Sequence, residues 1–464
     1  MRASAVAEKF GLPTVSLVCD GFVSQGSFTA AGLGMTNLPM AAYPGPVNLH
    51  SVEEIKKNVA EVMIDQVIKG LMVQPAEVKP SLEPGPRDIV FKGTPDEVNR
   101  FFYEKEWGDG LPIVLPIIEK VEEFLRYTDR PADEVIGVLL PDKREATVWN
   151  VAVNGVMSGC RPEYMPVLVA LVEAMADPKF GQEHLGHTPG TEVLITINGP
   201  IIKDLGFNYE QGALRVGFQA NTSIGRFWRL YLRNVAGFLP HKTDKGTFGG
   251  TWRVVLAENE DALAKIGWEP MSVDQGFKAG DNVITINSCT STDSIFSVGA
   301  ATAEEILDIL VTRIVDIQLY LVWLTFDGLC LRPQILLSPC VAEALARSGY
   351  SKEKVKQYFY EHARFPAKRF EQQCPSRGPL CDAVKQGRLP KQYCESTDPN
   401  RLVPIVWSPD DFMITVSGDP GKDNCFICAQ NGIIGHPVSK KIELSANWAQ
   451  LLKQAKTAYD IITT

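Results

Sequence analysis

The chain has 464 residues, of which 45% are hydrophobic and 22% charged, and it carries a net charge of −9 with a pI near 5.4. This is the composition of an ordinary globular protein, and it excludes the basic stripe that a nucleic-acid partner requires. At about 150 residues per domain, a chain of this length predicts two or three folded units.

The first residues and the most apolar stretch both argue against export and membrane insertion. Glu8 and Lys9 stand where a signal peptide would be apolar. The apolar stretch at residues 306–331 contains Asp308, Arg313 and two further aspartates, which is typical of a buried helix rather than a bilayer span. We therefore expect a cytoplasmic protein with no membrane partner, in which most of the ten cysteines are free thiols.

The first 75 residues predict alternating strands and helices. Apolar runs at residues 13–19 and 38–43 indicate strands, and a Gly/Ser/Ala-rich helix is expected between them at residues 23–33. Ser51 and Glu54 have the spacing of a capping box and open a predicted amphipathic helix that runs to about residue 71. This order indicates a truncated Rossmann-like unit, half of a doubly wound parallel sheet that lacks the usual first strand and loop.

Four prolines between residues 74 and 88 predict a linker. We therefore divide the chain into an N-terminal unit at residues 1–75, a linker at 76–92 and a large domain at 93–464. Helical and strand-like patterns alternate in the large domain, which predicts a mixed α/β fold. The predicted helices cover residues 94–107, 118–127, 162–176, 223–235, 303–323 and 351–363. The predicted strands cover residues 192–198, 252–257, 282–287, 334–338 and 412–417. The polar segment 365–401 is predicted to be an exposed excursion.

Cys160 is the first candidate for chemistry. It follows a small-residue turn and precedes a predicted apolar helix, where the helix dipole and the free amides of the first turn favour a thiolate. Arg161 would act in the same direction, and the side chain of Asn154 lies nearby in sequence. A catalytic thiol also needs a base. The candidates are His184, His187 and His241, of which we select His187. The competing interpretation is a small apolar cysteine packed beneath the turn.

A second group of residues indicates an anion site. Asn198 ends a predicted strand in the tight turn Asn-Gly-Pro, and Asn221, Ser223 and Arg226 stand at a predicted helix start. Free amides at that start, together with Arg226, would receive a carboxylate or phosphate. The alternative is a well-capped helix with Arg226 in a structural salt bridge. The spacing of the glycines matches neither a dinucleotide-binding fingerprint nor a P-loop, so no nucleotide cofactor is indicated. The cofactor stays unknown.

The third group is the CxxC pair Cys425 and Cys428. Such a pair is either a redox dithiol or half of a zinc site. The further zinc ligands available are Cys374, Cys381, Cys394 and His436, and their spacing fits no common finger pattern. The alternative is two unpaired thiols in a glycine-rich loop. In that loop, residues 418–421 could also bring backbone amides to an anion.

Residues 2 to about 75 resemble the C-terminal part of the UGSC-type selenoprotein family and, more distantly, selenoprotein B of the clostridial glycine and betaine reductases. The matching text is Gly-Leu-Pro-Thr-Val-Ser-Leu-Val at residues 11–18, Gly-Leu-Gly-Met at 32–35 and Leu-Pro-Met-Ala-Ala-Tyr-Pro-Gly at 38–45, followed by the closing helix. In those families the selenocysteine or cysteine redox motif lies just upstream of this stretch. The resemblance therefore implies the fold and not a catalytic residue.

From about residue 98 onward the chain resembles an uncharacterised family often seen beside that selenoprotein family. The matching phrases include Trp-Gly-Asp-Gly-Leu-Pro-Ile at residues 107–113, the run at 152–164 around Cys160, and Ala-Asn-Thr-Ser-Ile-Gly-Arg at 220–226. This resemblance implies no established reaction. The fused arrangement implies that the two halves act together.

The leading hypothesis is a thiol-dependent oxidoreductase or carbon–heteroatom bond-cleaving enzyme, in which Cys160 acts on a small anionic substrate held near Asn221 and Arg226. Reduction is implied only through the selenoprotein resemblance. One alternative is a non-redox lyase or hydrolase that uses the same pocket. Another is a ligand-binding or accessory subunit that docks a separate redox protein through its N-terminal unit.

Overall fold

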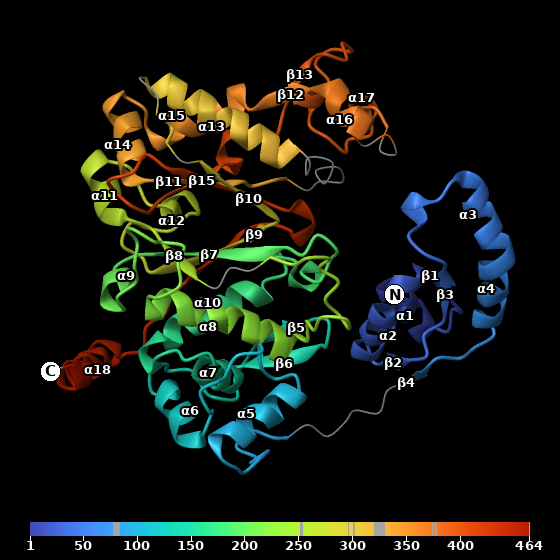
Figure 1. The fold of residues 1–464 in the computed structure, drawn as a ribbon, viewed down its shortest axis with the longest axis horizontal. Helices are drawn as coiled ribbons and strands as arrows, with labels where there is room; N and C mark the ends of the chain where they lie inside the picture. The colour runs from blue at the N-terminus through green and yellow to red at the C-terminus, as the bar shows by residue number, and fades with distance from the viewer. Residues whose placement is uncertain are drawn as a thin grey trace.

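The computed structural model describes residues 1–77, 84–250, 254–295, 297–299, 302–319, 330–373, 375 and 378–463. Four predictions lie partly or wholly outside these residues: the middle of the linker, the start of the strand at 252–257, the end of the helix at 303–323, and any role of Cys374. The described chain is mixed α/β, as predicted (Figure 1).

The N-terminal unit is built on two parallel strands, β1 (Ser16–Cys19) and β3 (Met40–Tyr43). Helices α1 (Arg2–Lys9) and α2 (Val23–Gly32) belong to the same unit, and β2 (Met35–Thr36) pairs with β4 (Ala76–Glu77). The predicted long helix is present as α3 (Val52–Asn58), a π-helical stretch (Val59–Met63) and α4 (Ile64–Gly70). Its capping box between Ser51 and Glu54 is confirmed. Helix α1 was not predicted from the sequence; it forms because Ala5 packs against α2 in a small apolar cluster with Ala30.

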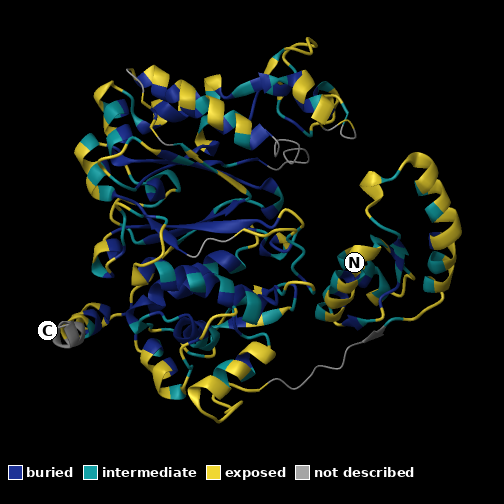
Figure 2. Cartoon of the chain, in the orientation of Figure 1, coloured by how far each residue is buried: buried dark blue, intermediate teal, exposed yellow. Residues whose placement is uncertain are grey.

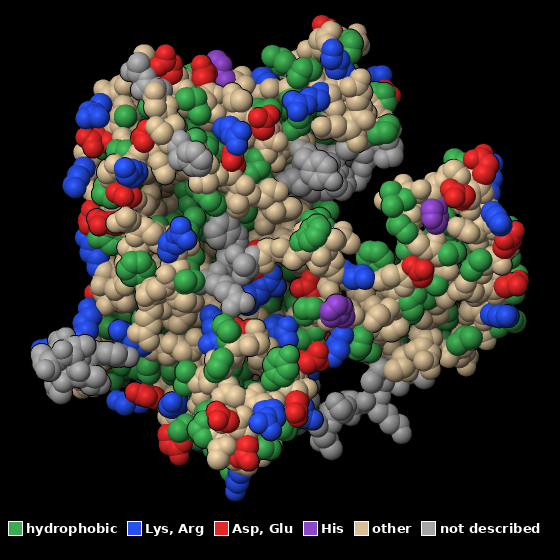
Figure 3. Space-filling view, viewed as in Figure 1, with side chains coloured by type: hydrophobic (Ala, Val, Ile, Leu, Met, Phe, Trp, Pro, Cys, Tyr) green, Lys and Arg blue, Asp and Glu red, His purple; other side chains and the backbone are tan. Residues whose placement is uncertain are grey.

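Much of the apolar surface of this unit is uncovered. Helix α2 contacts the large domain, where Ser24 Oγ and Gln25 Nε2 donate to the carbonyl oxygens of His241 and Thr243 at 3.3 and 3.1 Å. Leu17 on β1 nevertheless remains 66% exposed, and Figure 3 shows hydrophobic side chains on the surface of this unit. A two-stranded parallel sheet is small for a doubly wound unit.

The large domain contains two four-stranded sheets that lie face to face. The first has the order β16-β9-β7-β8 and the second the order β10-β15-β11-β14. Figure 1 shows α8 and α10 over the outer side of the first sheet and α13, α14 and α15 over the outer side of the second, so the layers run helix, sheet, sheet, helix. The inner strands of both sheets are largely buried, whereas the edge strand β10 is mostly exposed (Figure 2).

The strands of the first sheet are β7 (Glu192–Asn198), β8 (Val255–Ala257), β9 (Val283–Cys289) and β16 (Val438–Lys441). Those of the second are β10 (Ser291–Ile295), β11 (Gln334–Leu337), β14 (Met413–Val416) and β15 (Cys425–Ala429). The helices around them include α5 (Pro95–Glu104), α6 (Ile118–Leu125), α7 (Val148–Met157), α8 (Met165–Ala176), α9 (Ile201–Asp204), α10 (Gln219–Tyr231), α11 (Glu260–Ile266), α12 (Met271–Asp274), α13 (Ala303–Gln318), α14 (Pro339–Arg347), α15 (Lys352–His362) and α18 (Trp448–Thr463). A hairpin of β5 (Val135–Leu139) and β6 (Arg144–Thr147) precedes α7.

Each sheet combines one parallel pair with antiparallel neighbours. Strands β7 and β8 are parallel, as are β11 and β14. Between the sheets, Gln334 on β11 donates to Thr196 on β7 and to Thr415 on β14 at 3.0 and 2.9 Å. The facing surfaces therefore interlock through buried polar side chains as well as apolar ones, and these hydrogen bonds fix one relative position of the two sheets.

A repeated pattern links the two parallel pairs. Helices α11 and α14 follow β8 and β11, and the sequences Asp-Ala-Leu-Ala-Lys-Ile-Gly-Trp at residues 261–268 and Glu-Ala-Leu-Ala-Arg-Ser-Gly-Tyr at 343–350 match closely. A glycine of positive φ follows each helix, Gly267 (+71°) directly after α11 and Gly349 (+86°) two residues after α14. The Nε1 of Trp268 donates to the carbonyl oxygen of Tyr350 at 3.2 Å, so the matching ends touch. The sequence analysis missed this match.

Three predictions on local structure are corrected. The CxxC pair lies in strand β15 and not in a loop. Residues 365–401 are not the exposed excursion that was predicted. This part of the chain forms β12 (Arg364–Pro366), α16 (Ala367–Gln373), α17 (Leu380–Lys385) and a short 3₁₀ helix. Its residues Phe370 and Tyr393 are buried in the core next to the second sheet. Helix α10 begins at Gln219, so Asn221 and Ser223 lie within the helix instead of capping it. In the described part of the chain, every helix is too short or too polar to serve as a transmembrane segment.

Candidate functional site

A cavity of about 580 Å³ opens where the parallel strands β11 and β14 end. We call it the carboxyl-end cavity. It lies between the two sheets and receives residues from both, together with the loop that precedes α10. Its lining consists of Gln211, Gly212, Ala213, Leu214, Arg215, Leu256, Ser294, Leu336, Ser338, Ser417, Gly418, Asp419, Lys422, Asn424, Cys425 and Phe426. Ligands of α/β proteins bind characteristically outside the carboxyl ends of parallel strands.

The rim of the carboxyl-end cavity is held by backbone turns after β14. Ser417 Oγ donates to the carbonyl oxygen of Ala257 at 2.8 Å, which ties the end of β14 to the end of β8. Gly418 follows with a φ of +98°, a conformation that suits glycine, and the side chain of Asp419 accepts from the amide of Gly421 at 2.8 Å. The chain thereby turns sharply and brings Lys422 to the rim.

The charges at the rim favour an anion. Arg215 and Lys422 are both exposed at the cavity, and within the residues that the structure describes neither forms an ion pair. Asp419 is the single acidic side chain in the lining. Two cations against one carboxylate leave a net positive charge, which attracts a carboxylate or phosphate group.

The inner wall of the cavity is apolar. Leu256 of the first sheet and Leu336 of the second are buried in one cluster with Leu194, and Phe426 packs against that cluster. The cavity therefore offers a charged rim and an apolar floor, which suits a small molecule with an anionic group and a short hydrocarbon part.

Cys425 and Cys428 do not form a dithiol site. Successive side chains of β15 point to opposite sides, so Cys425 joins the helix-side core and Cys428 joins the core between the sheets. Burial raises the pKa of Cys425 to about 12. Burial also raises the pKa of Cys428, as does the neighbouring thiol of Cys289 on the facing sheet. The partner of Cys428 is therefore Cys289.

The proposed zinc ligands are not assembled either. Cys381 and Cys394 form a disulfide with each other. Within the described ranges, no three His, Cys, Asp or Glu side chains are grouped so that they could hold a metal ion. His436, the remaining candidate, contacts Arg332 instead.

Cys160 lies where the sequence placed it, between α7 and the 3₁₀ turn (Pro162–Tyr164) that leads into α8, but its environment differs from the prediction. The side chain is 9% exposed. Burial raises the pKa of the Cys160 thiol to about 11, although hydrogen bonds from Ser158 and Ser223 and the charge of Arg226 act in the opposite direction. The prediction that the pKa of the Cys160 thiol is lowered is therefore wrong. Arg161 forms an ion pair with the buried Glu163.

The predicted anion-binding residues Asn221 and Arg226 on α10 already bind other groups of the protein. Arg226 Nε and Nη2 donate to the two carboxylate oxygens of Asp109 at 2.9 and 2.8 Å, and Nη2 also donates to the carbonyl oxygen of Pro112 at 3.0 Å. Asn221 is fully buried; its Nδ2 donates to the carbonyl oxygens of Asn208 and Val255, and its Oδ1 accepts from the amide of Asn208. Ser223 and Arg226 do converge on Cys160, but Asn221 has no donor left for a ligand.

The other two predicted site residues lie in separate places. Asn198, at the end of β7, donates to the carboxylate of the buried Glu258 at 2.6 Å. Burial raises the pKa of Glu258. His187 hydrogen-bonds with Asn431 at 2.9 Å and Thr191 at 3.1 Å, and no hydrogen bond joins it to Cys160 in the described chain. Burial lowers the pKa of His187.

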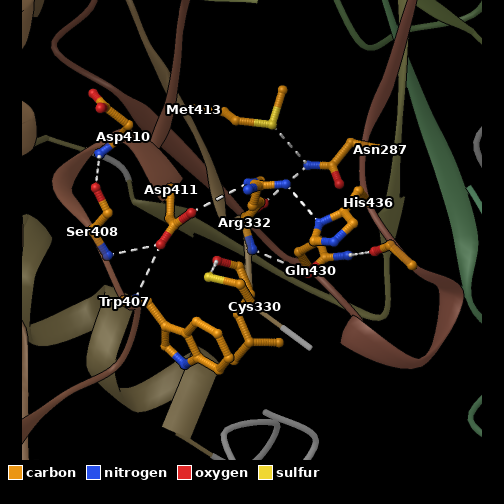
Figure 4. Close-up of polar contacts among 12 residues, drawn as sticks. Asn287, Cys330, Arg332, Trp407, Ser408, Asp410, Asp411, Met413, Gln430 and His436 are labelled. Carbon is orange, nitrogen blue, oxygen red and sulfur yellow. Dashed lines mark hydrogen bonds and ion pairs between the residues drawn. The ribbon is translucent and has the colours of Figure 1, made fainter. Parts of the chain in front are cut away.

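Arg332 is the centre of another polar cluster, shown in Figure 4. Its Nε donates to Asp411 at 3.3 Å, its Nη1 lies 2.6 Å from His436 Nδ1, and its amide donates to Gln430 at 3.0 Å. Asp411 in turn accepts from the amide of Ser408 at 2.8 Å. The cluster joins the start of β11 to the segments before β14 and β16, so we assign it to the packing of the two sheets against each other.

Arg215 and Lys422 were not among the residues selected from the sequence. A signal that could have drawn attention to Lys422 is a short sequence match: Ile-Thr-Ile-Asn-Gly-Pro-Ile-Ile-Lys at residues 195–203 and Ile-Thr-Val-Ser-Gly-Asp-Pro-Gly-Lys at 414–422 each place a lysine after the end of a strand. Lys203 is paired with Asp261 at 2.7 Å. No sequence pattern pointed to Arg215.

Residues 1–73 match the model of the UGSC family. No match was found among curated proteins or among solved structures. The resemblance of the N-terminal unit to the UGSC family is therefore confirmed, and the matched residues lie outside the carboxyl-end cavity, whose lining falls between residues 211 and 426.

Proposed function

We propose that the large domain binds a small organic anion with a short apolar part in the carboxyl-end cavity. The observation that carries this proposal is the combination of two cations, Arg215 and Lys422, with an apolar floor at the carboxyl ends of β11 and β14. The proposal keeps the small anionic ligand predicted from the sequence and moves it from α10 to this cavity.

In this proposal Arg215 and Lys422 hold the anionic group at the rim of the cavity, and Ser338 offers a hydroxyl group just inside it. Leu256 and Leu336 cover the hydrocarbon part and exclude longer or polar tails.

Ligand-observed NMR with propionate, butyrate, hexanoate and inorganic phosphate tests the proposal. For the tightest binder, Lys422→Met and Arg215→Met are each expected to weaken binding by about tenfold, because each removes a hydrogen bond to a charged group. Lys203→Met is the matched control, since it removes an exposed lysine that also follows a strand end but lies outside the cavity lining. Equal weakening by the control, or binding that neither cavity variant changes, would refute the assignment.

A second candidate function is thiol-dependent chemistry on the same ligand. The observation in its favour is that Cys340, at the start of α14, is partly exposed, neighbours the buried Cys425 and donates to the carbonyl oxygen of the rim residue Lys422 at 2.8 Å. If the two thiols gave two electrons and two protons to form a disulfide, a carbon–heteroatom bond of the ligand would become a C–H bond and release the protonated heteroatom group. Free-thiol counting after incubation with a 2-substituted short carboxylate tests this: loss of two thiols that requires Cys340 supports it, and an unchanged count contradicts it.

A further inference from the structure

A second cavity, of about 510 Å³, lies between helices α11 and α14. The two helices pack against each other at one edge of the large domain (Figure 1), and the segments that follow them touch through Trp268 and Tyr350. We call the space the α11–α14 cavity. It shares no lining residue with the carboxyl-end cavity, so the two cavities are separate.

A buried side-chain amide supplies a hydrogen-bond donor to the α11–α14 cavity. Asn259 lines the cavity and is 4% exposed. Its Oδ1 accepts from the amide of Ala262 at 2.9 Å, which caps α11 and fixes the orientation of the side chain. Its Nδ2 donates to no group in the part of the chain that the structure describes, and it is not sealed from solvent. This donor is therefore open to an acceptor oxygen of a ligand.

The start of α14 also favours a negatively charged group. Pro339 and Cys340, the first two residues of this helix of 9 residues, line the cavity. The side chain of Ser338 does not cap the helix, and the backbone amides of Cys340 and Val341 have no acceptor within the described residues. Free amides and the positive end of the helix dipole attract an anionic group such as a carboxylate.

The rim of the α11–α14 cavity carries one unpaired charge of each sign. Asp261, Glu343 and Arg347 already take part in ion pairs. Lys265 and Glu210 are exposed, and neither forms an ion pair in the described ranges. The unpaired charges of this cavity thus balance, whereas those of the carboxyl-end cavity are net positive. A zwitterionic ligand matches such a rim better than a simple anion does.

The walls between the charged groups are apolar. Ala262 and Ile266 lie one turn apart on α11, Ala346 lies on α14, and all three are only partly buried in the core next to the second sheet. We propose that the α11–α14 cavity binds a free α-amino acid with an aliphatic side chain. The carboxylate accepts from Asn259 and from the start of α14, the ammonium group lies near Glu210, and the side chain covers the apolar walls.

Isothermal titration with L-leucine tests the proposal. Isocaproate, which is leucine without the amino group, and isopentylamine, which is leucine without the carboxylate, are each expected to bind about tenfold more weakly. Asn259→Asp keeps the oxygen that caps α11 and replaces the donor with a negatively charged oxygen, so it should weaken leucine binding by at least about tenfold. Glu210→Gln, at an exposed position, should weaken leucine binding but not isocaproate binding. Circular dichroism confirms that the variants are folded.

Lys422→Met is the control that separates the two cavities, because leucine also has a carboxylate and a short apolar part. This variant should leave leucine binding unchanged. Absence of binding at millimolar leucine overturns the proposal, as does wild-type affinity in a folded Asn259→Asp variant. If Lys422→Met abolished binding, leucine would occupy the carboxyl-end cavity and the α11–α14 cavity would not be its site.

Discussion

Cys160 is expected to react slowly with iodoacetamide, even though it stands close to the start of an apolar helix. With the pKa of its thiol raised by burial to about 11, about one molecule in 10,000 carries the thiolate at pH 7. An ordinary thiol with a pKa of about 8.5 is about 3% thiolate at that pH, so labelling of Cys160 should be roughly 300-fold slower than that of a cysteine in an unstructured peptide. The 9% exposure of the side chain slows the reaction further.

Mass spectrometry of labelled peptides over a range of pH measures this for each cysteine. Cys19 and Cys340 are partly exposed and serve as internal references, and a Cys160→Ser variant confirms the assignment of the peptide. The rate at Cys160 should keep rising up to about pH 11. Labelling as fast as the peptide reference, with an apparent pKa below about 8.5, would refute the structural reasoning and restore the poised thiolate predicted from the sequence.

Three further results are expected. Asn221→Ala should lower the free energy of unfolding by about 2–4 kcal/mol in urea titrations, because it leaves the buried backbone groups of Asn208 and Val255 without their hydrogen-bond partner. An unchanged midpoint would contradict this. Burial and the neighbouring Arg332 lower the pKa of His436, so the unfolded chain binds a proton at this residue more readily than the folded chain does. The wild type should therefore lose stability relative to His436→Gln as the pH falls below about 6.5. An equal difference in melting temperature between the two proteins at pH 7 and at pH 5 would argue against this. Diamide should link Cys428 to Cys289 and not to Cys425, which peptide mapping can decide, a Cys425–Cys428 link being the opposing outcome.

The sequence was most informative where a local pattern decides the structure. The continuous apolar run at residues 192–198 forms β7 with the predicted bounds, because a strand covered on both faces needs no polar alternation. The capping box at Ser51 likewise depends on residues that are neighbours in the chain.

The site was not predictable from local patterns, because it depends on contacts between distant segments. Cys160 is buried by α10, whose residues Ser223 and Arg226 come from more than sixty positions later in the chain. The spacing of Cys425 and Cys428 suggests a site in a loop, but in a strand it directs the two thiols to opposite faces. The carboxyl-end cavity exists only once two sheets are stacked, so no single segment could reveal it.

The carboxyl-end cavity is tested most directly by filling it. Ser294 lies on β10, is exposed and lines the cavity, so Ser294→Trp should obstruct it with little effect on the core. Thr292→Trp, on the same face of the same strand but outside the lining, is the control. For the carboxylate that binds the wild type most tightly, we predict that Ser294→Trp weakens binding by at least about tenfold while Thr292→Trp leaves it unchanged. Wild-type affinity in a folded Ser294→Trp variant would contradict the account.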